Sequence, residues 1–485
     1  MTLKHRTFSA VRWTTAAAIA RALLQLAQVA VLARLLVPED YGLMAMVSVV
    51  LGFASIFADM GVNGAYLQHQ NVTLEQRSSL FWLNVGMSII LTLIVLAASP
   101  LMAVFFGDDR LTLLLMLAAS TFVIGALGQQ VRMTSEKALD FRPVVLVEMA
   151  ATILGFSSAL AAAFSGWGVY ALVLGSIVTT GFSTALAWLF LAHGWRPMWR
   201  FRLSDIRSYL GFGGALVANN IVNEFNKSFD LLLGGRMLAA SVLGMYNLPR
   251  QLVFQIQGTV NPIITRVGFP LIAQVQKDIP QVRAIYLKTL NMTAATNAPL
   301  YMGIAFFAPE VVHIVFGAKW LAAADLLCLM AIWGFFRSTG NPVGSLLLGM
   351  GRADLSLKWN VSILCLLPPV LWIGSKYGTL GLAWSMLGFS AVMFVPGWFV
   401  LVRPLCEARL LEYMIAALRP LFIAVAGIAP AYLLTTQITN AYLHISLAVL
   451  ISAPLYLAFS YFLNREWLVA MLHLLAPGRA IEIKH

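Results

Sequence analysis

Long apolar runs, separated by short polar turns, recur along the whole chain. Each contains 18 or more mostly apolar residues, enough for a helix to cross the hydrocarbon core of a bilayer. The pattern predicts an all-α polytopic membrane protein with about fourteen transmembrane helices. Their predicted ranges are 11–36, 41–67, 80–106, 111–134, 143–164, 167–192, 208–235, 242–272, 286–308, 320–349, 355–374, 378–402, 413–435 and 441–463.

The first half of this pattern returns in the second half. The segment LARLLVPEDYG at 32–42 resembles LGGRMLAASVLGMY at 233–246, which aligns Arg34 with Arg236 and Gly42 with Gly244. Further matches follow in the same order: Arg77 with Arg283, Gly107 with Gly317, Asp140 with Asp354, Gly168 with Gly381 and Gly175 with Gly388. Because six helices are an even number, both copies start on the same side of the membrane. We therefore expect two six-helix lobes related by a pseudo-twofold axis along the membrane normal.

The repeat predicts the organisation of the chain. We expect an N-terminal lobe at 1–193, a cytoplasmic interfacial linker at 194–207 and a C-terminal lobe at 208–403. Two additional helices follow at 404–463. The last segment, 464–485, has the pattern of an amphipathic helix lying on the cytoplasmic surface.

Composition and charge support this topology. The chain is 60% hydrophobic and 11% charged, whereas soluble domains carry about 25% charged residues. Its net charge is +12, but most Lys and Arg lie in alternate loops, as the positive-inside rule describes. This distribution predicts that both termini are cytoplasmic and argues against nucleic-acid binding. The three cysteines lie far apart and suggest neither a disulfide framework nor a metal site.

Several segments resemble a known family of membrane proteins. They are ARLLVPEDYG at 33–42, ADMGVNGAYLQ at 58–68, FDLLLGGRMLAASVLGMYNL at 229–248 and VGFPLIAQVQKD at 267–278. These segments resemble the Wzx-type polysaccharide translocases of the multidrug/oligosaccharidyl-lipid/polysaccharide exporter superfamily. The branch that serves colanic acid and similar exopolysaccharides is the most similar in character.

The resemblance implies a function. Such a protein would flip undecaprenyl-diphosphate-linked oligosaccharides from the cytoplasmic to the periplasmic leaflet of the bacterial inner membrane by alternating access. Its partners would be the lipid-linked oligosaccharide and membrane lipids, together with a polysaccharide polymerase and chain-length machinery if it acts in an assembly. It would use no cofactor, and coupling to H⁺ or Na⁺ stays open.

Ionisable residues inside the predicted spans are the candidates for substrate contact. A charge at the bilayer centre costs about 2.5–3.5 kcal/mol on insertion scales, so such residues usually face a partner or a wet cavity. The arginine candidates are Arg21, Arg250, Arg266 and Arg337. The other candidates are Asn220, Asn223, Glu224, Lys227 and Asp230 of the 208–235 helix, and Gln257 of the next one. Asp59 is a candidate for gating or ion coupling.

Two interpretations of these residues stay open. In the first, helical stripes line a hydrophilic cavity, where arginines bind the lipid diphosphate bidentately and the other polar groups meet sugar hydroxyls. In the second, the charges are ties that hold helices together without touching substrate, and for Asp59 this structural interpretation is the stronger one.

Three other functions compete with the translocase. A cation-coupled multidrug exporter of the same superfamily would favour intramembrane carboxylates, and a lipid II flippase would carry a peptidoglycan precursor. A polysaccharide polymerase or ligase would be an enzyme, but such enzymes typically have large external loops. The loops predicted here are short, which argues against catalysis.

Overall fold

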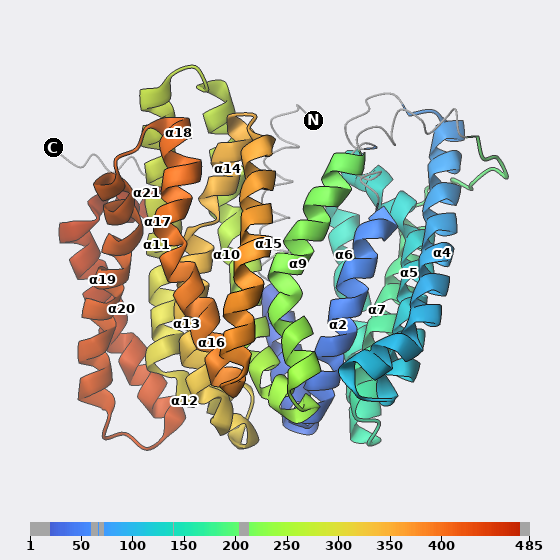
Figure 1. The fold of residues 1–485 in the computed structure, drawn as a ribbon, viewed down its shortest axis with the longest axis horizontal. Coiled ribbons are helices and arrows are strands. Elements are labelled where there is room, and N and C mark those ends of the chain that lie inside the picture. The colour runs from blue at the N-terminus through green and yellow to red at the C-terminus, as the bar shows by residue number, and fades with distance from the viewer. Residues whose placement is uncertain (1–19, 60–65, 67–71, 139, 203–212, 476–485) are drawn as a thin grey trace. The chain divides into compact units, whose positions relative to one another are not determined.

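The computed structural model describes residues 20–59, 66, 72–138, 140–202 and 213–475, and every regular element in these ranges is a helix. The helices divide into two compact units (Figure 1). Unit 1 comprises Met1–Leu248 and Ile363–Ser375, and unit 2 comprises Pro249–Ser362 and Lys376–His485. The lobe boundaries predicted from the repeat stay a prediction.

Unit 1 is a bundle of long helices. A helical segment at 20–35 precedes the named helices. These are α2 (Pro38–Asp59), α4 (Leu74–Phe106), α5 (Arg110–Lys137), α6 (Phe141–Phe164), α7 (Val169–Phe190) and α9 (Gly213–Met237). Helix α10 (Ala240–Gln274) begins in this unit, and α15 (Ala353–Ser375) ends in it.

Unit 2 contains the rest of α10 and α15 together with the helices that follow them. Its first part holds α11 (Ile279–Phe306), α12 (Ala308–Val315), the 3₁₀ helix η1 (Ala318–Ala323), α13 (Ala324–Thr339) and α14 (Pro342–Gly349). Its second part holds α16 (Gly378–Val392), α17 (Phe394–Gly397), the π-helical η2 (Trp398–Val402), α18 (Arg403–Cys406), α19 (Leu410–Thr435), α20 (Ala441–Leu463) and α21 (Arg465–Leu475).

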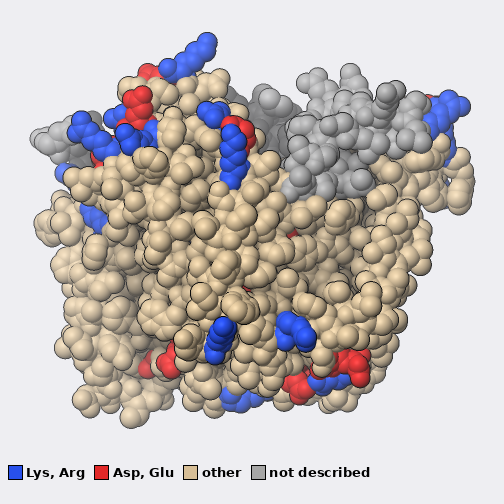
Figure 2. All heavy atoms as spheres, viewed as in Figure 1, with Lys and Arg blue, Asp and Glu red and all other residues tan. Residues whose placement is uncertain are grey.

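The helices have the length and hydropathy of a multi-span membrane protein. Within the described residues 10 segments are long and apolar enough to cross a membrane, or 11 if α11 and α12, bent by 86°, form one span. In the face drawn in Figure 2, Lys, Arg, Asp and Glu gather mostly towards the ends of the helices. Helices α9 and α10 are not among the 10, because their polar stripes lower the mean hydropathy. The count of about fourteen therefore stays a prediction.

Helix boundaries follow local capping rather than hydropathy. Helix α4 begins before the predicted apolar run, because Thr73 and Gln76 form a reciprocal capping box at its start. It ends at Gly107, whose φ of 76° is the left-handed conformation that glycine adopts readily. In the following turn Arg110 donates hydrogen bonds to Asp108, which lowers the pKa of that carboxyl group.

The linker folds onto unit 1 as far as it is described. The indole N–H of Trp82 donates to the carbonyl of Met198, and the rings of Trp82 and Trp199 stack with centroids 4.6 Å apart. The guanidinium of Arg77 lies 3.8 Å from the ring centroid of Trp195. This concentration of tryptophan and arginine is typical of a segment at a membrane surface.

Helices α2 and α10 cross with their backbones in direct contact. A Cβ atom on Gly42 would lie 1.8 Å from the carbonyl oxygen of Ala240, and one on Gly244 would lie 1.7 Å from that of Pro38. Only glycine allows this approach. The sequence repeat relates these two contacts to each other, because the alignment that pairs Gly42 with Gly244 also pairs Pro38 with Ala240. We call this the reciprocal Gly42–Gly244 contact.

A carboxylate–imidazole pair ties α12 to α20 inside unit 2. Nδ1 of His444 lies 2.9 Å from Oε1 of Glu310, and the two side chains are 5% and 19% exposed. The ring of Phe307 packs edge-on against His444 with centroids 5.2 Å apart. The pair is therefore largely shielded from solvent, so loss of one partner leaves the other without compensation.

We expect H444L to destabilise the protein by about 3 kcal/mol, because Glu310 would keep its buried carboxylate without the imidazole. The double variant E310M/H444L removes both polar groups and should recover most of the loss. The measurement is the thermal unfolding midpoint of the detergent-purified protein. A double variant less stable than H444L would contradict this account of the pair.

Candidate functional site

Two arginines of unit 2 are held at one phenylalanine. The guanidinium carbon of Arg250 lies 4.5 Å from the ring centroid of Phe254, and that of Arg337 lies 4.7 Å from it. Nε of Arg337 also donates to Oε1 of Gln257 at 3.1 Å, and its guanidinium lies 5.4 Å from the ring of Trp333. We call Arg250, Phe254, Gln257, Trp333 and Arg337 the arginine cluster.

Helical spacing explains how the cluster is assembled. Positions 250, 254 and 257 are i, i+4 and i+7 of α10 and share one stripe, whereas 333 and 337 are one turn apart on α13. Cation–π contacts of this kind contribute about 0.5–2 kcal/mol each, more where water is excluded. Arg250 is only 6% exposed and Arg337 is partly buried. The structure thus brings together three of the predicted residues, Arg250, Gln257 and Arg337.

The same stripe of α10 ends in a packing contact. Asn261 is 2% exposed; its amide donates to the carbonyl of Ser338 at 3.0 Å, and its oxygen accepts from Asn297 at 2.9 Å. Tyr301 also lies 3.0 Å from the hydroxyl of Ser338. These bonds join α10, α11 and α13 and fix the helices that carry the arginine cluster.

Helix α9 of unit 1 presents an exposed polar stripe. Asn220, Asn223 and Lys227 are all exposed, and their spacing of three and four residues puts them on one face. Their contact with substrate stays a prediction. The stripe provides amide donors and acceptors and one ammonium, groups suited to hydrogen bonding with hydroxyl-rich ligands.

The two acids of α9 have different environments. Glu224 accepts from Lys227 at 3.2 Å and from Ser228 at 2.8 Å, both on the same helix, and its carboxylate lies beside Gly52 of α2. Asp230 is 1% exposed and accepts from the hydroxyl of Tyr246 at 2.9 Å. Asp230 is therefore buried beside Tyr246, whereas Glu224 pairs with Lys227 at the edge of the exposed stripe; their predicted contact with substrate stays a prediction.

Arg21 forms an ion pair with Glu148, which joins the 20–35 helix to α6. Their side chains are 46% and 32% exposed, so the protein fully encloses neither partner. Positions 21 and 148 lie far apart in the sequence, so this pairing depends on the tertiary structure. Arg21 is tied in this structure, yet half of its side chain stays accessible.

Two predicted residues lie outside the described side chains. Arg266 belongs to α10 and Asp59 is the last residue of α2. Their predicted roles stay predictions.

Comparison with known proteins identifies the family. A family model described as "Polysaccharide biosynthesis protein" matches residues 31–325. The chain is 30% identical over 435 residues to the lipopolysaccharide biosynthesis protein WzxC of Escherichia coli (strain K12), covering 90% of this chain and 88% of that protein. The chain belongs to the Wzx-type polysaccharide biosynthesis family. It is a multi-pass membrane protein with bacterial relatives.

Two solved structures have a similar fold. A structure of lipid II flippase MurJ in an inward closed conformation superposes with a TM-score of 0.72 at 13% identity, covering 93% of this chain and 98% of MurJ. An inward-facing multidrug resistance MATE family transporter superposes with a TM-score of 0.57 at 14% identity, covering 86% and 96%. The fold is that of the multidrug/oligosaccharidyl-lipid/polysaccharide superfamily, and these relatives are transport proteins, not enzymes.

Proposed function

We propose that this Wzx-type protein flips undecaprenyl-diphosphate-linked oligosaccharide repeat units from the cytoplasmic to the periplasmic leaflet by alternating access. The observation that carries the proposal is the arginine cluster in a chain of this family. Two permanently charged guanidiniums lie 4.5 and 4.7 Å from the centroid of one ring, and guanidinium groups bind phosphate oxygens bidentately. Transport would serve the assembly of exopolysaccharide, capsule or O-antigen.

Each part of the cluster has a distinct role in this proposal. Phe254 and Trp333 position the guanidinium groups through cation–π contacts. Gln257 orients Arg337 through a neutral hydrogen bond. In unit 1, and independently of the cluster, the exposed stripe of α9 offers Asn220, Asn223 and Lys227 as groups that can form hydrogen bonds with sugar hydroxyls.

Reconstitution tests the proposed substrate. The purified protein is placed in vesicles with a short-chain fluorescent undecaprenyl-diphosphate oligosaccharide, and exposure of the sugar is followed with an impermeant lectin. We expect the sugar to reach the opposite leaflet faster than in protein-free vesicles. The same assay is run with lipid II and with a lipophilic cationic dye as alternative substrates. Transport of the dye alone would favour a multidrug exporter, and transport of lipid II alone a peptidoglycan flippase.

We also propose the topology given by the charge distribution. With α11 and α12 counted as one span, the 11 apolar spans together with the 20–35 helix, α9 and α10 make up the proposed fourteen. They form two six-helix lobes related by a pseudo-twofold axis, plus two C-terminal helices, with both chain ends in the cytoplasm. The reciprocal Gly42–Gly244 contact supports this repeat.

Cysteine accessibility checks the topology. In a variant without the three native cysteines, single cysteines replace the exposed residues Asp109, Ser165 and Thr436, or Arg196 and Lys277. An impermeant thiol reagent added to intact cells should label the first three positions only, because they follow outward-running spans. Labelling of Lys277→Cys before the membrane is permeabilised would show the orientation to be wrong.

A further inference from the structure

A surface pocket of unit 2 lies where η2, α18 and the start of α19 meet. Its volume is about 890 Å³, and its lining includes Trp398, Phe399, Arg403, Glu407 and Arg409. The substrate proposal uses none of these residues. Two arginines beside two aromatic rings at the end of a helix bundle are typical of the membrane–water interface.

The pocket is positively charged. The carboxylate of Glu407 lies 3.7 Å from Arg283, and that of Glu412 accepts a hydrogen bond from the backbone N–H of Arg409 at 3.0 Å. The side chains of Arg403 and Arg409 are exposed, and among the described residues no ion pair engages either guanidinium. Both acids of this region thus have partners of their own, and two guanidiniums stay accessible to an anion.

Local structure holds the pocket open. The indole N–H of Trp398 donates to the carbonyl of Ala408 at 3.0 Å, which closes the turn between α18 and α19. The guanidinium of Arg403 lies 5.9 Å from the ring of Trp398 and 5.6 Å from that of Phe399. The wider turn of the π-helix η2 places these rings, and such short π-helical segments often occur at functional sites.

Apolar surface leads away from the pocket along two helices. On the α16–η2 side, Val392, Val395 and Phe399 are spaced as a stripe and are 64%, 41% and 57% exposed. On the other side, the stripe of α19 starts at Leu410 in the pocket and continues through 414, 418 and 422 at four-residue spacing.

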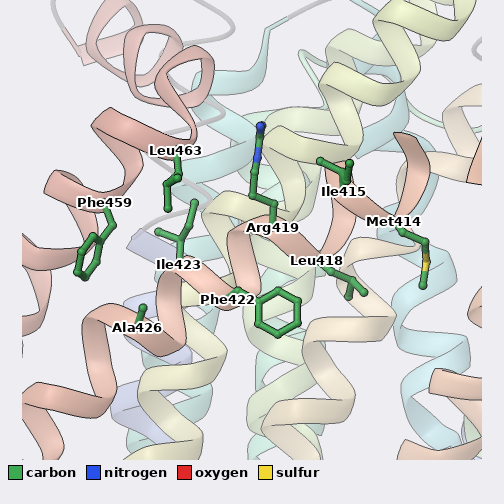
Figure 3. A pocket seen from close by; sticks show the side chains of 9 residues that line it. All are labelled: Met414, Ile415, Leu418, Arg419, Phe422, Ile423, Ala426, Phe459 and Leu463. Atoms are coloured by element: carbon green, nitrogen blue, oxygen red, sulfur yellow. The ribbon is translucent and has the colours of Figure 1, made fainter. Parts of the chain in front are cut away.

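The α19 stripe forms one wall of an apolar groove between α19 and α20 with a volume of about 600 Å³ (Figure 3). Leu418 and Phe422 come from α19, and Phe459 and Leu463 from α20. The guanidinium of Arg419 stands at one end of this groove, where it donates to Oδ1 of Asn464 at 2.8 Å. An anionic head with acyl chains matches this combination of basic pocket and apolar stripes.

We infer that Arg403 and Arg409 bind the headgroup of an anionic phospholipid, whose acyl chains lie along the stripes of η2 and α19. Basic pockets between helices at the cytoplasmic side are the usual sites for anionic headgroups. The phosphate of the lipid accepts from the two guanidiniums, while Trp398 and Phe399 contact the glycerol region. This lipid is a resident of the protein's surface and is not transported.

The test compares lipid retention by native mass spectrometry. Protein freed of lipid in a neutral detergent is mixed with phosphatidylglycerol or with phosphatidylcholine of the same acyl chains. Each guanidinium near an anionic headgroup contributes about 1 kcal/mol, so we expect the wild type to retain phosphatidylglycerol about thirtyfold better. R403Q/R409Q should reduce this preference to about twofold, and R403K/R409K should keep most of it.

The control K277Q/R142Q removes two exposed positive charges elsewhere and should keep the preference. If R403Q/R409Q does not fold, displacement of the bound lipid from the wild-type protein by competing anions provides the test instead. Millimolar inorganic phosphate should not displace the lipid, because it lacks acyl chains. Displacement by phosphate, or one-for-one displacement by undecaprenyl diphosphate, would overturn the inference, as would an equal preference in R403Q/R409Q and wild type. None of these results depends on transport activity.

Discussion

Replacing Gly244 by alanine is expected to destabilise the protein by about 3 kcal/mol and to reduce its abundance in the membrane several-fold. The added methyl group would lie 1.7 Å from the carbonyl oxygen of Pro38 and 3.0 Å from the backbone nitrogen of Gly42. Both obstacles are backbone atoms, which cannot rotate away as a side chain does. Alanine in an ordinary helical position has the opposite effect, because it favours the helix by about 1 kcal/mol.

Helix α10 offers a matched control at Gly258, where an added Cβ would meet nothing within 4 Å. G258A should therefore be as stable as the wild type or slightly more so. The measurements are the thermal midpoint in detergent and the amount of protein in isolated membranes. Equal stability of G244A and G258A would mean that the two helices do not meet through their backbones.

The second large effect is expected at Arg337. R337A should reduce polysaccharide export by about tenfold or more, since it removes a charge-assisted contact to the diphosphate. Membrane abundance should stay near the wild-type value, because the contacts to Gln257, Phe254 and Trp333 that the variant loses are contacts with neutral groups. R337K should restore only part of the export, since an ammonium cannot form the bidentate fork.

The readout compares surface polysaccharide with membrane abundance in the same cells. R352A is the control, because Arg352 is exposed and pairs only two residues away with Asp354. R250A should behave like R337A if both guanidiniums hold the diphosphate. Full polysaccharide export by both R250A and R337A would show that the arginine cluster does not take part in transport. Loss of protein along with export would instead make the two arginines structural ties.

The sequence was most informative where a property repeats along one helix. Asn220, Asn223 and Lys227 share an exposed stripe because their spacing follows the helical period, and the same spacing placed Arg250 and Gln257 together. Phe254 was missed because it is apolar, although its position between those two residues on one stripe was the available signal. Span positions were predictable because each apolar run is long enough to cross a bilayer.

Pairings between distant helices were beyond the sequence. Neither Glu148 as the partner of Arg21 nor Tyr246 as the partner of Asp230 follows from spacing, since each contact depends on how helices pack. The sequence also did not predict the bend between α11 and α12, because α12 lies almost entirely between the predicted spans 286–308 and 320–349. Which polar residues touch substrate stays a prediction, because contact with a ligand is a property of the complex.

The Gly42–Gly244 crossing also has a consequence for the history of the chain. The repeat exchanges the two halves of this contact, Gly42 against Ala240 and Gly244 against Pro38. Two identical chains form contacts of this kind where they meet on a twofold axis. If the proposed lobes arose by duplication of one six-helix unit, a single codon supplied both glycines in the ancestor. After duplication and fusion the two codons mutate separately, but both glycines are needed for the same close approach of the α2 and α10 backbones. Once either position gains a side chain the helices must separate, and the other glycine is no longer required. Among relatives, the two glycines should therefore be kept together or lost together.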